Sequence, residues 1–175
     1  MDKLILRLPT ETDEAQIWAY REAVLKADNG TINGGGGLQE SDSFAVWLEQ
    51  ARGNRSPATV RLGLMPATTM IAVREADRAV VGFIDIRHTL NDHLLNHGGH
   101  IGYSVHPLER RKGYAKEMLR QALEFCRTEL KLDRVLVTCD ADNEPSRRTI
   151  LANGGLLEDT RDQDGTPVQR YWVTL

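Results

Sequence analysis

The chain has 175 residues, of which 41% are hydrophobic and 27% charged, as in an ordinary globular protein. Its net charge of −3 argues against a nucleic-acid surface or a polybasic membrane contact, and no apolar run approaches the roughly 20 residues of a membrane span. Residues 1–7 lack the apolar region and cleavage site of a signal peptide, so a cytoplasmic protein is expected. Cys126 and Cys139 are then expected to be reduced, buried thiols.

The spacing of apolar residues predicts alternating strands and helices in a single domain over residues 1–175. In chain order these are strand 3–8, helix 12–27, helix 41–53, strands 68–74 and 79–87, strand 99–105, helix 114–130, strand 133–139, helix 145–152, and strands 156–160 and 168–174. Thr10 or Thr12 is expected to cap the first helix and Ser41 the second. Between these helices, the glycine-rich stretch 28–37 is predicted to be a mobile loop.

The most informative stretch, residues 104–115, has the pattern of a strand, a short basic loop and a helix start. Arg110-x-x-Gly113-x-Ala115 places small residues where the backbone approaches a ligand. Backbone N–H groups at a helix start have no partner within the helix, so they can bind a pyrophosphate, and the cations at 110–112 add charge there. Taken alone, the motif also fits a basic loop that caps an ordinary surface helix.

This motif resembles the acyl-CoA loop of the GCN5-related N-acetyltransferases (GNAT), and the order of predicted elements matches that fold over nearly the whole chain. The resemblance implies an α/β (α+β) fold with a mixed, centrally splayed sheet of about six to seven strands and about four helices. It also implies acetyl-CoA as co-substrate, no metal, and a small-molecule or peptide amine as acceptor. The segments 98–105, 138–140 and 153–155 are similar to a set of predicted bacterial acetyltransferases without a settled substrate.

The resemblance assigns cofactor contacts to two parts of the chain. In the family, the strand before the phosphate loop pairs with the pantetheine arm, and an Asn after the fifth strand faces the thiol end with a small residue at the next helix start. The cofactor-binding residues implied here are Ser104, Val105, His106, Arg110, Arg111, Lys112, Gly113, Tyr114, Ala115, Lys116, Asn143 and Ser146. Asn143 is equally suited to cap the following helix, and the two roles are compatible.

The chain departs from the family at Ile150, where many members carry a tyrosine that protonates the leaving thiolate. Ser146, Tyr103 and Cys139 are the candidates for that role. Transfer to an amine also needs a base, which the family usually supplies from the strand 99–105. Tyr103 shares the parity of Val105, whereas His100 points to the opposite face unless a bulge shifts the register.

Tyr103, His100 and Ser146 are therefore the catalytic candidates. Asp85 and His88 form an alternative acid–base pair, or a surface salt bridge. The pair His93-x-x-x-His97 raises the question of a metal site, but the region has no cysteine and many turn formers, so no metal is predicted. The histidines are expected to border the acceptor pocket or to face water.

The family places the acceptor between the first two helices and the closing hairpin. The acceptor is therefore expected to lie near the glycines 34–37 and near Tyr171 and Trp172. Those glycines form either a lid or a plain surface connection. Asp28 and Glu40 lie near these glycines in the sequence, and their carboxylates are candidates for attracting a cationic amine.

The sequence thus predicts an acyl-CoA-dependent N-acyltransferase that transfers acetyl to an amine by direct attack in a ternary complex. Ile150 and the lack of a clear base motivate one alternative, a catalytically silent acyl-CoA sensor. An ATP site is disfavoured, because Gly-x-x-x-x-Gly-Lys-Ser/Thr is absent from the sequence. The closing strand offers an edge through which a homodimer could form.

Overall fold

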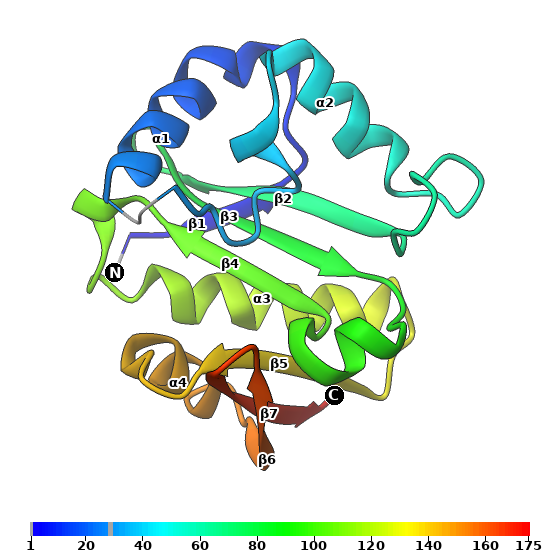
Figure 1. Ribbon diagram of the computed structural model, residues 1–175. Helices are drawn as coiled ribbons and strands as arrows, with labels where there is room; N and C mark the ends of the chain where they lie inside the picture. Colours follow the sequence, from blue (N-terminus) through cyan, green and yellow to red (C-terminus); the bar gives the residue numbers. More distant parts are fainter. Residues whose placement is uncertain (1, 28–29) are drawn as a thin grey trace.

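The computed structural model describes residues 2–27 and 30–175 and shows one seven-stranded sheet with helices on both faces (Figure 1). The strands are β1 (Leu4–Arg7), β2 (Ala67–Arg74), β3 (Val80–Arg87), β4 (Ile101–Val105), β5 (Arg134–Asp140), β6 (Leu156–Gln163) and β7 (Thr166–Thr174). The longer helices are α1 (Glu14–Ala27), α2 (Phe44–Gly53), α3 (Tyr114–Thr128) and α4 (Glu144–Leu151). Short 3₁₀ turns are η1 (Glu11–Asp13), η2 (Leu38–Glu40) and η4 (Pro107–Glu109), and η3 (Leu94–Gly98) is a single π-helical turn.

The sheet has the order β1-β2-β3-β4-β5-β7-β6, and every neighbouring pair is antiparallel except β4 and β5. Between β4 and β5 a single register position is paired in the described chain, Ile101 opposite Val137. Beyond that position the two strands separate, which leaves main-chain groups of both without a strand partner. The predicted mixed, centrally splayed sheet with four flanking helices is confirmed.

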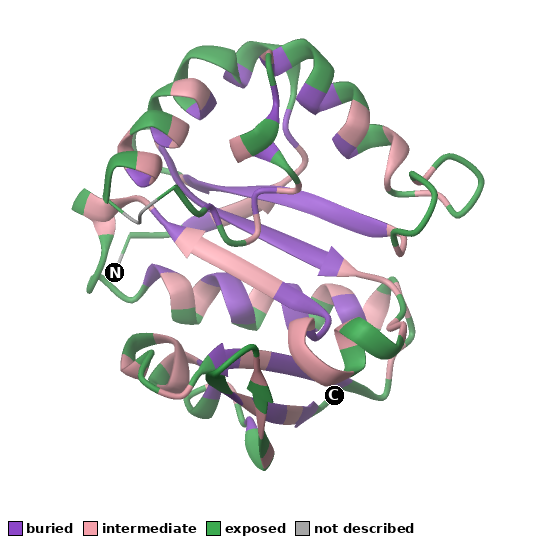
Figure 2. Ribbon diagram, viewed as in Figure 1, coloured by how far each residue is buried: buried purple, intermediate pink, exposed green. Residues whose placement is uncertain are grey.

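Two apolar clusters hold the helices on the sheet, and β2 contributes to both. Met70 and Ala72 face the cluster that contains α3, whereas Ile71 and Val73 face the cluster of α1 and α2. This alternation follows from the two-residue period of a strand, and it buries β2 on both faces (Figure 2). No helix of the described ranges is long and apolar enough to cross a membrane.

Capping residues explain where the first two helices begin. Thr10 precedes η1 and α1, and both its backbone N–H and its hydroxyl donate to Asp13 Oδ2, at 2.8 and 2.9 Å. The predicted cap of α2 was wrong by two residues, because the hydroxyl of Ser43 accepts the Val46 N–H at 3.3 Å. Ser41 instead donates to the Gly37 carbonyl at 2.9 Å and so closes the preceding turn.

The glycines before α2 allow the chain to lie directly on the sheet. A Cβ atom at Gly34 would stand 2.4 Å from the Gly102 carbonyl oxygen, and one at Gly36 would stand 2.3 Å from Thr69 Oγ1. The Trp47 indole N–H also donates to the Gly35 carbonyl at 2.9 Å. Residues 30–37 are thus a packed segment and not the predicted mobile loop, while residues 28 and 29 lie outside the described residues.

Candidate active site

The separation of β4 from β5 opens a cleft of about 1030 Å³. It runs from the η3 turn, past the diverging strands, to the start of α3. Of the residues predicted to bind or act, the cleft is lined by Tyr103, Ser104, Val105, Arg110, Arg111, Gly113, Tyr114, Ala115, Lys116, Asn143 and Ser146. Two distant motifs, one on each side of the splay, therefore face the same space.

One end of the cleft is lined by residues of the segment 105–116, which the sequence predicts to bind the cofactor and which is here called the cofactor corner. Arg111 and Gly113 both have left-handed backbone conformations, with φ of 63° and 87°, and Gly113 is the N-cap of α3. Such turns direct successive N–H groups to one side, and the free N–H groups of the first helical turn add to them. Arg110 Nε donates to the Val105 carbonyl at 3.1 Å, which ties the loop to the end of β4.

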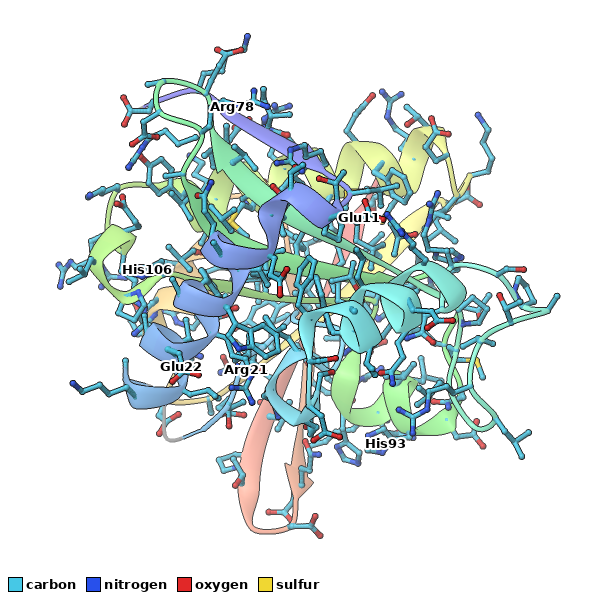
Figure 3. The ribbon with its side chains drawn as sticks, turned by 90° about the horizontal axis from the view of Figure 1, so that it is seen from above. Glu11, Arg21, Glu22, Arg78, His93 and His106 are labelled. Carbon is cyan, nitrogen blue, oxygen red and sulfur yellow. The ribbon has the colours of Figure 1, made fainter. Side chains whose placement is uncertain are left out.

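Two predicted cofactor residues lie outside the cleft lining. Lys112 Nζ is 2.8 Å from Glu109 Oε2, and that carboxylate also pairs with Arg74 at 2.8 Å. His106 Nδ1 accepts the Leu108 N–H at 3.3 Å, and its ring contacts Tyr20 with centroids 5.7 Å apart. Figure 3 shows His106 near α1, the helix that carries Tyr20. The cleft therefore has two lining cations in this loop, Arg110 and Arg111, in place of the three expected.

A pair of hydroxyl groups lies where the two halves of the cleft meet. Tyr103 on β4 and Ser146 in the first turn of α4 have their oxygens 2.7 Å apart. Asn143 caps α4, with its Oδ1 accepting the Ser146 N–H at 3.2 Å, so the cap role predicted from the sequence exists and sets the position of Ser146. Burial raises the pKa of Tyr103 to about 12, so its phenol is protonated at neutral pH.

Cys139 lines the cleft close to this hydroxyl pair. Burial raises the pKa of its thiol to about 11, and the pKa of the Cys126 thiol, inside the α3 core, to about 12. Neither thiol is therefore ionised at neutral pH, and both are free cysteines.

His100, predicted as a catalytic candidate, is held away from the cleft by main-chain bonds. The backbone N–H of His100 donates to the Leu136 carbonyl at 2.7 Å, and its ring Nδ1 accepts the Leu136 backbone N–H at 3.0 Å. Burial lowers its pKa to about 4, which keeps the ring neutral. The imidazole therefore closes the narrow end of the splay between β4 and β5.

Two further expectations meet a different geometry. Ile150 is fully buried in the α3 cluster, so the position usually held by tyrosine lies inside the core. His88, one residue beyond β3, has its Nε2 2.8 Å from Thr68 Oγ1, whereas Asp85 accepts from Thr69, so among the described residues no hydrogen bond or ion pair joins Asp85 to His88 directly. Residues 85 and 88 are an odd number of positions apart, and strand alternation separates them.

The histidine pair that raised the question of a metal site lies at the η3 turn, with His93 directly before the turn and His97 within it. His93 and His97 lie with ring centroids 5.8 Å apart on η3 (Figure 3 labels His93). Within the described ranges, no group of three or more His, Cys, Asp or Glu side chains could hold a metal ion. His97 lines the cleft, as expected of a histidine at the border of the pocket.

The β6–β7 hairpin lines the cleft with other residues than the predicted Tyr171 and Trp172. Tyr171 is buried and its hydroxyl donates to Gln169 at 2.6 Å, while Trp172 donates to Glu158 at 3.0 Å; neither lines the cleft. Gln163 and Val168 line it instead.

Arg87 is a cleft residue that the sequence did not single out. It donates from Nη1 to the carbonyls of Gly98 and Gly99, at 3.2 and 3.3 Å, and so ties the end of β3 to the turn before β4. The available signal was its shared parity with Asp85 on β3, which places both side chains on the same face of the sheet.

A family model for the acetyltransferase (GNAT) domain matches residues 3–155, and the chain belongs to this family. It is thus an acyltransferase of the N-acetyltransferase type, and its acceptor is a separate question.

Known proteins extend this similarity over the whole chain. The uncharacterized N-acetyltransferase YoaA of Bacillus subtilis (strain 168) is 26% identical over 180 residues, covering 95% of this chain and 89% of the relative. The structure of Mycobacterium smegmatis RimJ in complex with CoA-disulfide has a TM-score of 0.71 at 22% identity and covers 98% of this chain and 81% of that one. Ribosomal-protein-S5-alanine acetyltransferase from Vibrio fischeri has a TM-score of 0.69 at 14% identity, covering 99% and 94%. At these identities the two structures show a common fold.

Proposed function

We propose that the protein binds acetyl-CoA in the cleft and transfers its acetyl group directly to the amine of a bound acceptor. One observation carries the proposal: the cleft joins an anion-binding cofactor corner to the hydroxyl pair Tyr103–Ser146 through the unpaired edges of β4 and β5. The pyrophosphate would contact the N–H groups around Gly113, and the pantetheine arm would pair with the main chain of Ser104 and Val105.

The reaction requires no covalent enzyme intermediate. The neutral amine nitrogen attacks the thioester carbonyl carbon, and a main-chain N–H of β4 near Val105 stabilises the oxyanion, an interaction worth about 3 kcal/mol in comparable sites. The carbon–sulfur bond then breaks and its electron pair remains on sulfur. The nitrogen loses one proton to solvent and the sulfur gains one, so the overall reaction is balanced.

Ser146 and Tyr103 are proposed as the source of the sulfur's proton. Ser146 donates to the thiolate, and Tyr103, which lies 2.7 Å from the serine oxygen, restores the serine proton and then regains its own from solvent. This assignment replaces the tyrosine expected at position 150, because the buried Ile150 does not line the cleft. It also removes the main argument for a silent sensor, since a protonated hydroxyl is available in the cleft.

The acceptor proposed is a small-molecule or peptide amine. One solved structure of this fold bears the name ribosomal-protein-S5-alanine acetyltransferase, which names an alanine of a protein as the acceptor of that enzyme. For this chain, the acceptor-side residues Arg87 and His97 line the same cleft as the cofactor corner, so an amine held between them would lie in the space where the strands diverge.

Calorimetric titration with acetyl-CoA, followed by a thiol-release assay against a panel of amines, tests the proposal. Micromolar or tighter binding of acetyl-CoA, together with thiol release that depends on an added amine, is the expected result. Binding without transfer to any amine of the panel would favour the sensor, and a folded protein that retains no CoA at millimolar concentration would overturn the cofactor assignment.

A further inference from the structure

The π-helical turn η3 is fixed to the sheet by donors from four strands. Thr138 Oγ1 donates to the His97 carbonyl at 2.9 Å, and the Arg170 side chain, which bonds the same turn, is only 2% exposed. Turns of this kind are rare and occur frequently at functional sites. His97, which lines the cleft from this turn, therefore has a defined position. The four donors are Arg87 on β3, Thr138 on β5, Arg161 on β6 and Arg170 on β7.

His97 lies at the end of the cleft that an acyl group would reach. The pair Ile101–Val137 marks the apex of the splay, and Thr138, which holds the His97 carbonyl, is the next residue of β5. The cofactor corner lies at the opposite end of the cleft, beyond Val105, and about 13 Å separates Val105 from Ile101 at about 3.3 Å per residue. A pantetheine arm that starts at the corner and follows β4 therefore carries its thioester toward the apex.

His97 and the hydroxyl pair Tyr103–Ser146 lie on opposite faces of the sheet. The residues on either side of Thr138 along β5 face the α3 cluster, so the Thr138 side chain points to the other face. Because Thr138 bonds the η3 turn, that turn covers the face opposite to α3. Tyr103 packs against the α3 cluster instead, and its hydroxyl meets Ser146 on α4. A thioester in the splay would thus have the hydroxyl pair on one side and His97 on the other.

The two ring nitrogens of His97 have different surroundings. Nδ1 is enclosed by protein, and within residues 2–27 and 30–175 it has no hydrogen-bond partner. Nε2 is therefore the nitrogen through which the ring can meet a molecule in the cleft. A neutral imidazole carries its proton on one nitrogen and accepts at the other. Because an enclosed N–H without an acceptor is costly, the proton is expected on Nε2.

This tautomer makes His97 a hydrogen-bond donor toward the cleft. A histidine base needs a free Nε2 and its own proton on Nδ1, where a carboxylate or carbonyl normally holds it. No such partner meets Nδ1 of His97 in the described ranges. The attacking amine needs its lone pair for the thioester carbon, so a donor directed at that nitrogen would oppose the reaction. The thioester carbonyl oxygen, on which negative charge develops, is the acceptor that such a donor stabilises.

We infer that the Nε2–H of His97 donates a hydrogen bond to the carbonyl oxygen of the acetyl group and stabilises the oxyanion together with the main-chain N–H of β4. The inference rests on the proposed function and adds a catalytic residue to it. The proton stays on Nε2 throughout, since the ring acts only as a donor, and the proton of the amine still passes to solvent.

Infrared spectra of bound acetyl-CoA, labelled with carbon-13 at the thioester carbonyl, test the inference without an acceptor. A hydrogen bond to the oxygen lowers the carbonyl stretching frequency, so the band should lie at lower frequency in the wild type than in His97→Ala. His97→Gln carries an amide N–H and should retain part of this shift. His93→Gln, at an exposed position directly before the same turn, should retain all of it. The same frequency in the wild type and in His97→Ala would overturn the inference.

Nitrogen-15 NMR of the histidine-labelled wild type determines the tautomer directly and needs no change at the site. At pH 8 the His97 signals, assigned by their absence from the spectrum of His97→Gln, should show a protonated Nε2 and an unprotonated Nδ1. The reverse pattern would contradict the donor role, because the nitrogen at the cleft would then carry a lone pair.

The thiol-release assay, with the best amine of the panel, gives the kinetic effect. At pH 8 kcat should fall about 100-fold in His97→Ala, as on loss of one oxyanion donor, and less than about tenfold in His97→Gln. Equal losses in the two variants would show that the N–H does not carry the effect.

Calorimetry separates failure of this inference from failure of the proposed function. If the wild type binds acetyl-CoA but its carbonyl band does not respond to His97→Ala, the role of His97 is wrong and the cofactor site stands. If acetyl-CoA itself does not bind, both are wrong.

Discussion

The cofactor corner and the second cavity are built by opposite means. The corner is one continuous stretch, residues 105–116, with left-handed backbone at Arg111 and Gly113 and the start of α3 directly after them. The second cavity, of about 880 Å³ on the α2 side of the sheet, is assembled from residues within 31–46, 50–67 and 85–94, and side chains such as that of Asp85 form its wall. A local main-chain site has a recognisable motif, whereas a site assembled from distant side chains has none. Substitutions in the two regions are therefore expected to have different effects.

The largest effect is expected where main-chain packing covers the second cavity. Gly34→Ala places a methyl group 2.4 Å from the Gly102 carbonyl at a left-handed φ, and should lower the free energy of unfolding by about 3 kcal/mol or more. Gly63→Ala is the matched control, since Gly63 has φ of 86° with no atom within 4 Å of the added Cβ, and about 1 kcal/mol is expected. Urea denaturation measures both, and equal losses would show that the segment does not press on the sheet.

The next effect should be confined to the cofactor corner. Gly113→Val opposes the left-handed turn at the α3 N-cap and adds bulk where a phosphate approaches the backbone, so the Kd for acetyl-CoA should rise at least about 100-fold, or about 2.7 kcal/mol. Gly165→Val carries the same strain at φ of 86° in the β6–β7 turn, away from the cleft, and should leave the Kd within about threefold. Similar Kd values for the two variants would argue against the assignment.

A smaller effect is expected where the cofactor cleft meets the reacting atoms. Tyr103→Phe removes the phenol beside Ser146 and should lower kcat about 30-fold, below the usual range for a general acid because a thiolate leaves readily. Because burial raises the pKa of Tyr103 to about 12, the wild-type phenol remains a donor to about pH 11, and kcat should not decline between pH 8 and pH 10 through its ionisation. A kcat for Tyr103→Phe equal to that of the wild type, with unchanged acetyl-CoA affinity, would remove Tyr103 from the mechanism.

The smallest effect concerns the closed end of the splay, and it appears as a pH dependence of stability. Burial lowers the pKa of His100 to about 4, below its ordinary value near 6.5, so the unfolded chain binds more protons between these values. The stabilisation is complete above about pH 6.5 and is lost as the pH falls toward 4. At pH 5.5 the loss should be about 1.4 kcal/mol relative to pH 8.

His100→Asn tests that pH dependence, since its amide oxygen can take the place of Nδ1 as acceptor for the Leu136 N–H. Chemical denaturation at pH 8 and pH 5.5 should show a smaller difference in this variant than in the wild type, while His93→Asn, at an exposed position, should behave as the wild type. An identical pH dependence in His100→Asn would place the titration elsewhere.

The sequence by itself determined the elements, their order and the loop-to-helix pattern of residues 104–115, because each of these depends on local properties. Apolar spacing specifies strands and helices, and left-handed turns, prolines and helix starts act within a few residues of one another; Gly113 and Ala115 are examples. The predicted cap of α2 was wrong because Ser41 and Ser43 both carry a hydroxyl that can cap a helix. In the structure the Ser41 hydroxyl donates to the Gly37 carbonyl, and the Ser43 hydroxyl accepts the Val46 N–H at the start of α2.

Only the tertiary structure decided the partners of side chains that meet from distant segments. It paired Glu109 with Arg74, placed His100 between β4 and β5, paired Tyr103 with Ser146 across the cleft, and packed Gly34 against Gly102 and Gly36 against Thr69. Such contacts depend on strand register and on which helix covers which face, and these are properties of the assembled sheet. A short stretch of sequence contains neither, so the motif alone could not predict these contacts.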